Sequence, residues 1–119
     1  MKNSIGIDIS KAHLDVHHLG TGRTAHFSNA PAGFRALTRF IGTQQPDLVV
    51  YEATGPYHAR FERAFSGRLP LVKVNPLQAR RFAQACGTRT KTDAVDARVL
   101  AQMGHALELA ADAPASEKH

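Results

Sequence analysis

Cysteine, tryptophan and long apolar runs are scarce or missing in this chain of 119 residues. Its one cysteine, Cys86, excludes an internal disulfide framework and any zinc site that needs several cysteines. No stretch reaches the ~18 consecutive apolar residues of a transmembrane helix. The segment Met1–Asp8 also lacks the long apolar core of a secretory signal. We therefore expect a cytoplasmic protein that has no membrane partner.

Aromatic residues account for only 7% of the sequence, but apolar residues as a class reach 43%. A chain of this length is the size of one domain, and it can bury enough surface to fold without disulfides or structural metals. The apolar residues are spread along the chain, which argues against disorder. We predict one domain over residues 1–109, followed by a tail over residues 110–119.

Acidic residues are also few, 10 against 15 basic residues, and the formal net charge is +5. The basic excess is concentrated in residues 60–98, where nine lysines and arginines accompany three acidic residues. Clustered basic charge is typical of a surface that binds a polyanion such as nucleic acid. A solvated, arginine-rich surface without a partner would give the same composition, so charge alone leaves both interpretations open.

Hydrophobic patterning predicts an α/β fold. Apolar or alternating runs predict strands at Ser4–Ile9, His13–Leu19, Arg23–Ser28, Leu48–Glu52 and Leu69–Val74, the second and third joined as a hairpin. Apolar stripes and capping residues predict four helices: one capped by Asn29, then Tyr57–Phe65, Pro76 to about Ala85, and Asp93 to about Leu109. This order predicts a mixed sheet of about five strands with helices on its faces.

Two acidic residues occupy unusual places in the predicted sheet. Asp8 interrupts an apolar strand, and it points away from the face that Ile7 and Ile9 share. Glu52 ends the apolar run that begins at Leu48, so it lies at the carboxyl end of a central strand, where α/β sheets bind ligands. A carboxylate buried there is costly unless a partner or a metal ion compensates its charge.

Two more acidic residues, Asp93 and Asp96, are three positions apart on the last predicted helix, so we expect them on one side of it. Asp93 could instead serve only the helix dipole. If these residues meet Asp8 and Glu52, four carboxylates repel one another unless a cation lies among them. Oxygen ligands suit Mg²⁺ or Mn²⁺, and two such ions can drive phosphoryl transfer. The alternative is four acids scattered over a surface.

Basic residues adjoin this set of acids. Arg89 and Lys91 belong to a polar loop just before Asp93, and Arg80 and Arg81 lie on the preceding helix. We predict that they hold a nucleic-acid backbone beside the metal site, although an arginine could simply pair with an acid. Lys11, in the turn after the first strand, could also approach a phosphate or be a plain exposed lysine.

Four motifs together are similar to a known family. They are GIDISK around Asp8, YEATGPY around Glu52, VNP at 74–76, and KTDAVDA at 91–97, the most specific of the four. In this order they match the D-E-D-D pattern of the Piv-type DNA invertases and their related insertion-sequence transposases. The resemblance extends from about Ser4 to Leu109.

This resemblance implies a ribonuclease H-like, RuvC-like fold in a prokaryotic protein. It implies that Asp8, Glu52, Asp93 and Asp96 bind divalent metal for cleavage and joining of DNA strands. In at least some members an element-encoded guide RNA directs recombination, and the full-length proteins act as homo-oligomers. Members also carry a C-terminal transposase domain with a catalytic serine, and no serine here matches that motif. We therefore expect an N-terminal domain that needs this second domain for complete transposition.

Three alternatives remain open at this stage. A RuvC-like nuclease that resolves Holliday junctions would use the same metal chemistry on a different substrate. A fragment that binds nucleic acid without catalysis would keep the fold and the acids. The segment GIDIS also resembles the first phosphate loop of actin-like sugar kinases, but those proteins need two such domains and an adenosine site, for which 119 residues leave no room.

Overall fold

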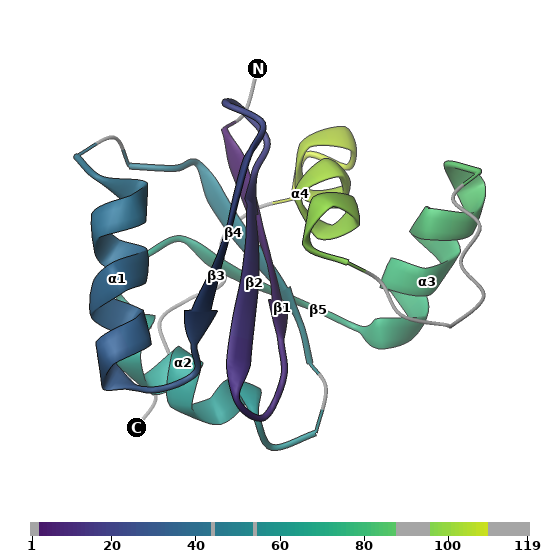
Figure 1. The fold of residues 1–119 in the computed structure, drawn as a ribbon. Helices are drawn as coiled ribbons and strands as arrows, with labels where there is room; N and C mark the ends of the chain where they lie inside the picture. Colours follow the sequence, from purple (N-terminus) through teal and green to yellow (C-terminus); the bar gives the residue numbers. More distant parts are fainter. Residues whose placement is uncertain (1–2, 44, 54, 88–95, 110–119) are drawn as a thin grey trace.

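The computed structural model describes residues 3–43, 45–53, 55–87 and 96–109. Its centre is a five-stranded sheet in the order β3-β2-β1-β4-β5 (Figure 1). The strands are β1 (Ser4–Ile9), β2 (His13–His18), β3 (Arg23–Ser28), β4 (Leu48–Glu52) and β5 (Leu71–Val74). The first three pair antiparallel, whereas β4 is parallel to β1 and β5 is parallel to β4. The predicted α/β fold with a mixed sheet is confirmed, and its topology agrees with a ribonuclease H-like fold.

Helices pack on both faces of the sheet (Figure 1). One face contacts α1 (Pro31–Ile41) and α2 (His58–Phe65), and the other contacts α3 (Pro76–Ala85) and α4 (Ala97–Ala106). We call them the α1/α2 face and the α3/α4 face. Alternate residues of each strand enter separate cores, as strand geometry requires: Val49 packs on the α1/α2 face and Val50 on the α3/α4 face. No helix in the described ranges is long and apolar enough to cross a membrane.

The α1/α2 face is filled by aromatic rings. Phe34, Tyr51, Phe61 and Phe65 are buried and contact one another edge-on or tilted, with ring centroids 5.1–6.5 Å apart. Such offset contacts add to the free energy gained from burial alone. This cluster fixes α1 and α2 against the sheet.

On the α3/α4 face, glycines let a helix approach the sheet closely. A Cβ atom on Gly6 of β1 would lie 1.9 Å from the carbonyl oxygen of Ala97 and 2.5 Å from the backbone nitrogen of Ala101. On α4 itself, a Cβ atom on Gly104 would lie 2.7 Å from a methyl group of Val50. The backbones of β1 and α4 are therefore nearly in contact, and this contact brings the start of α4 beside the carboxyl half of β1.

Several predicted boundaries are confirmed to the residue, including those of β1, β3, β4 and α3. Two strands are shorter than predicted, because β2 ends at His18 and β5 begins at Leu71. Pro70, which precedes β5, has no backbone N–H to give to a sheet ladder. Helix α2 begins one residue later than predicted, at His58.

Two predicted helix starts were wrong. The N-cap of α1 is Ala30, while the buried side chain of Asn29 donates to the carbonyl oxygens of Ser10 and Tyr57. Asn29 therefore joins two loops rather than capping a helix. The predicted last helix included Asp96, but Asp96 has extended backbone angles and is the N-cap of α4. Asp93 lies outside the described residues, so the structure does not address the predicted alignment of the two acids on one helix side.

Candidate functional site

Asp8 and Glu52 end neighbouring parallel strands and belong to the same face of the sheet. The register pairs Ile7 with Tyr51, and both of these residues point into the core of the α1/α2 face. The residues that follow them, Asp8 and Glu52, therefore point to the α3/α4 face. Both are partly buried. The parallel pairing of β1 with β4 thus brings these two carboxylates to one edge of the sheet.

The charges of these carboxylates influence one another. Burial raises the pKa of Asp8, and the nearby carboxylates of Asp15 and Asp96 raise it further. Burial also raises the pKa of Glu52, and the charge of Asp8 adds to this effect, while the guanidinium of Arg80 opposes it. Asp8 is therefore the electrostatic centre of a group of carboxylates from β1, β2, β4 and the start of α4.

Asp96 is held in place by its capping role. Its Oδ1 accepts a hydrogen bond of 3.0 Å from the backbone N–H of Val99, as N-cap residues do. One oxygen is occupied in this way, and the residue itself is exposed. The close packing of α4 on Gly6 fixes this capped helix start relative to Asp8. Asp93, the other acid predicted for this segment, lies outside the described residues.

Sequence reasoning missed Asp15, a further carboxylate at the site. The register of the β1–β2 hairpin places Asp15 directly opposite Asp8. Nδ1 of His26 on β3 lies 2.5 Å from Oδ1 of Asp15, and the His26 ring packs on His13 with centroids 4.4 Å apart. The tight turn between β1 and β2 was a usable signal, because it sets which residues oppose each other across a hairpin.

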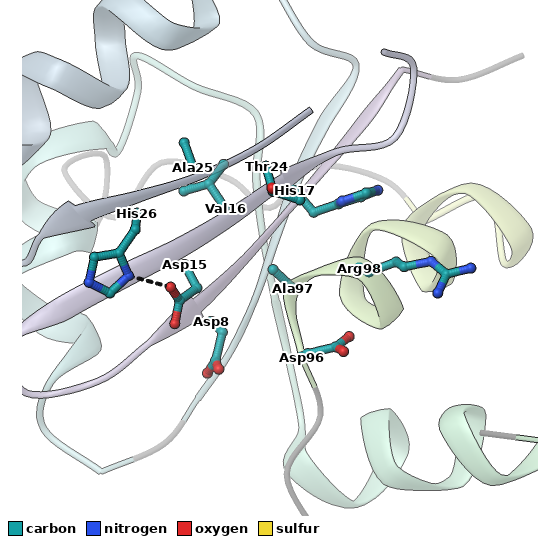
Figure 2. Close-up of a pocket in the computed structure, with 10 residues that line it drawn as sticks. All are labelled: Asp8, Asp15, Val16, His17, Thr24, Ala25, His26, Asp96, Ala97 and Arg98. Atoms are coloured by element: carbon teal, nitrogen blue, oxygen red, sulfur yellow. Dashed lines mark hydrogen bonds and ion pairs between the residues drawn. The ribbon is translucent and has the colours of Figure 1, made fainter. Parts of the chain in front are cut away.

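A cavity of about 540 Å³ opens beside these acids, between the β1–β3 strands and the start of α4 (Figure 2). Figure 2 shows Asp15 between His26 and Asp8, with Asp96 and Arg98 on the α4 side. The cavity is lined by Asp8, Asp15, Val16, His17, Thr24, Ala25, His26, Asp96, Ala97 and Arg98. It therefore joins an acidic region to a region that contains histidine and arginine.

The described residues include three of the four predicted metal ligands: Asp8, Glu52 and Asp96. Within residues 3–43, 45–53, 55–87 and 96–109, no three histidine, cysteine or acidic side chains are grouped closely enough to hold a metal ion. Asp93, the fourth predicted ligand, is outside those ranges. The structure brings Asp8, Glu52 and Asp96 to one region of the α3/α4 face, and the metal set stays a prediction.

The predicted nucleic-acid-binding residues are partly described. Arg80 on α3 is close enough to Glu52 for its charge to lower the pKa of that carboxyl group. Its neighbour Arg81 is exposed, and so is Lys11 in the turn after β1. Arg89 and Lys91 lie outside the described residues. Arg80 is thus the one described residue of this set whose charge is shown to reach an acid of the site, and nucleic-acid binding by the set stays a prediction.

Comparisons with known proteins give the family. A family model for DEDD transposases of the IS110 type matches residues 5–118, and its description is "Transposase". Two pilin gene-inverting proteins, from Moraxella bovis and Moraxella lacunata, are each 36% identical to the chain over 110 residues, which cover 87% of it. The chain spans about a third of their length, 34% in both cases. The chain therefore belongs to the family of IS110-type DEDD transposases.

Proposed function

We propose that this chain provides the metal-dependent site of a DNA recombinase that cleaves and joins DNA strands. Asp8, Glu52, Asp93 and Asp96 are the residues that would hold Mg²⁺ or Mn²⁺. The observation that carries this proposal is the placement of Asp8 and Glu52 at the ends of adjacent strands, partly buried, with raised pKa values and with Asp96 nearby. Such mutually repelling acids are typical of functional sites rather than of structural ones.

The donor set fits a hard divalent cation, because all of these side chains present carboxylate oxygens. Two such ions, when bound, would polarise the phosphate and stabilise both the attacking and the leaving oxygen of a phosphoryl transfer. The protein supplies the positions. The parallel pairing of β1 and β4 places Asp8 beside Glu52. The hydrogen bond that Asp96 accepts from the backbone N–H of Val99 orients the Asp96 side chain. A cation would also compensate the desolvation of the two strand carboxylates.

DNA as the substrate is supported by the family and by the basic charge. The name of the two relatives, pilin gene-inverting protein, describes a rearrangement of a gene. The basic residues of positions 60–98 include Arg80, whose charge reaches Glu52. We propose that the whole protein also needs a C-terminal domain and a homo-oligomer, and that an element-encoded guide RNA directs it, as the resemblance of its motifs implies.

A calorimetric titration of the chain with Mn²⁺ tests the metal site. We expect saturable binding to the wild-type chain and its loss in Asp8→Asn. The matched control is Asp47→Asn, because Asp47 precedes β4 at the opposite edge of the sheet from Glu52. Circular dichroism checks that both variants are folded. Equal isotherms for the wild type and Asp8→Asn would overturn the proposal and would favour a nucleic-acid-binding module without catalysis.

A further inference from the structure

The α4 end of the cavity contains two polar side chains that the metal site does not use. His17 of β2 is only 8% exposed, and its buried Nδ1 has no hydrogen-bond partner in the described residues. Arg98, in the first turn of α4, is exposed and lines the same cavity. Figure 2 shows both side chains extending toward the same end of the cavity, away from His26.

The protein leaves these two groups without evident compensation. A buried polar atom without a partner costs free energy, and such atoms are uncommon in folded proteins. Among the described residues Arg98 forms no ion pair, in contrast to Lys73, whose Nζ lies 3.0 Å from a carboxylate oxygen of Glu62. The cavity thus holds an exposed guanidinium and an imidazole ring side by side, two groups that can donate hydrogen bonds to an anionic ligand.

The two side chains would contribute differently. Burial lowers the pKa of His17 and the charge of Arg98 lowers it further, while the charge of Asp96 opposes them in part. The pKa stays below its ordinary value, so the neutral ring predominates near pH 7. Nδ1 is buried and has no partner among the described residues, so in this proposal the neutral ring carries its proton on Nε2, which donates to the ligand. Arg98 supplies the full charge and a planar set of donors suited to phosphate. The start of α4 adds a partial positive charge.

We propose that Arg98 and His17 seat one phosphate group of a nucleic-acid strand beside Asp8 and Asp96. This inference rests on the proposed function and adds where the strand lies: across β2 and β3, in the cavity next to the carboxylates. The neighbouring wall consists of Val16, Thr24 and Ala25. The cavity lining includes no phenylalanine, tyrosine or tryptophan for a base to stack on, so the proposed contact is to the backbone and is independent of sequence.

The test measures binding of a labelled single-stranded oligodeoxynucleotide by fluorescence anisotropy over a series of salt concentrations, with EDTA to remove metal. A contact to one phosphate contributes a slope of about −0.7 to log K against log salt for single strands. We expect Arg98→Ala to weaken binding about tenfold and to reduce the slope by about 0.7. Arg35→Ala is the matched control, because Arg35 is an exposed arginine on α1.

The neutral histidine gives a second, distinct expectation. His17→Gln should weaken binding several-fold and leave the salt slope unchanged, because a neutral donor releases no counterion. If His17→Gln is unfolded, as judged by circular dichroism, the Arg98→Ala result decides alone. A wild-type chain that binds no oligonucleotide, or an Arg98→Ala variant with the slope of Arg35→Ala, would overturn the proposal.

The Mn²⁺ titration separates this inference from the metal site. Arg98→Ala should bind Mn²⁺ like the wild type, since its side chain is not a metal ligand. If Asp8→Asn loses Mn²⁺ binding but Arg98→Ala keeps the wild-type salt slope, the proposed phosphate contact is wrong and the proposed metal site stands. If Asp8→Asn keeps Mn²⁺ binding but Arg98→Ala has a smaller slope of log K against log salt, the proposed phosphate contact stands and the proposed metal site is wrong.

Discussion

Partly buried acids on the two faces of the sheet have pKa values that are shifted in opposite directions. On the α1/α2 face, Glu62 accepts a hydrogen bond of 2.5 Å from the hydroxyl of Tyr51, and Nζ of Lys73 lies 3.0 Å from the same oxygen. Burial alone would raise the pKa of Glu62, but these two partners outweigh it and lower the pKa. On the α3/α4 face, Asp8 and Glu52 have raised pKa values, because burial disfavours their charged forms and neighbouring carboxylates add to this effect.

This difference distinguishes an acid that stabilises the fold from acids that the fold merely tolerates. Glu62 joins α2 to β4 and β5, so its charge contributes to stability. Among the described residues the carboxylates of Asp8 and Glu52 form no such hydrogen bond or ion pair, although the charge of Arg80 partly compensates Glu52. The metal-free protein is therefore less stable for holding them charged. Residues that lower stability where they lie are expected at functional sites. The comparison can be tested by changing each face separately.

The largest expected effect comes from the close packing of the α3/α4 face. Gly6→Ala should lower the free energy of unfolding by about 3 kcal/mol, because the added methyl group meets the backbone of α4. Gly22→Ala is the control: its Cβ would meet no atom within 4 Å, and only its positive φ of 74° adds strain, which costs about 1 kcal/mol. Urea unfolding measures both. Equal losses would show that α4 can move away from β1 freely.

Removing the compensated acid should be the next largest effect. Glu62→Gln should lower the free energy of unfolding at pH 7 by about 1 kcal/mol, since it weakens a charged hydrogen bond and a partly exposed ion pair. The lowered pKa makes this stabilisation present above the ordinary Glu value of 4.5 and lost as pH falls through the pKa of the folded chain. Unfolding curves at several pH values test this, with exposed Glu108→Gln as the control. A pH-independent difference between Glu62→Gln and the wild type would contradict it.

Removing an uncompensated acid should have the opposite sign. Asp8→Asn should raise the stability of the metal-free chain at pH 7 by about 1 kcal/mol. Because the pKa of Asp8 is raised above the ordinary value of 3.8, the folded chain binds more protons, and its stability falls as pH rises through that window. Thermal melts in EDTA between acid and neutral pH measure the difference. A variant less stable than the wild type at neutral pH would mean that Asp8 has a stabilising partner.

The smallest expected effect is on the pKa of Asp8 itself. Asp15→Asn removes the neighbouring negative charge that contributes to the raised pKa of Asp8, so that pKa should fall. Carboxyl carbon chemical shifts followed by NMR against pH report it directly. Asp47→Asn, at the other edge of the sheet, should leave the pKa of Asp8 unchanged. An unmoved pKa in Asp15→Asn would place Asp15 outside the group of acids.

Much of this fold could be predicted from local patterns. The run Leu48–Glu52 is apolar enough to be a central strand, and Pro76 with Asn75 marks the start of α3, where the Asn75 side chain does cap the helix. The positions of Asp8 within an apolar strand and of Glu52 at the end of another marked both acids as candidates, while the pairing of their strands was left open. These features depend on residues close in sequence or on general rules of α/β topology.

Other features depend on tertiary contacts that the sequence does not display. Asn29 has the residue type of an N-cap, but the surrounding loops supply two carbonyl oxygens that its side chain satisfies instead. Asp93 and Asp96 are both residue types that begin helices, so the sequence did not distinguish a helix that includes Asp96 from one that begins at Ala97. Asp15 becomes part of the site only through the exact register of a hairpin, and the pairing with His26 requires a third strand.

The most direct test is a pH titration of the carboxyl carbons of Asp8, Glu52 and Glu62 by NMR, with and without Mg²⁺. Without Mg²⁺, Asp8 and Glu52 should titrate above their usual range and Glu62 below it. Adding Mg²⁺ should lower the apparent pKa of Asp8 and of Glu52, because a bound cation favours their charged forms, and should leave Glu62 unchanged. Titration curves of Asp8 and Glu52 that do not move with Mg²⁺ would contradict a metal site on the α3/α4 face.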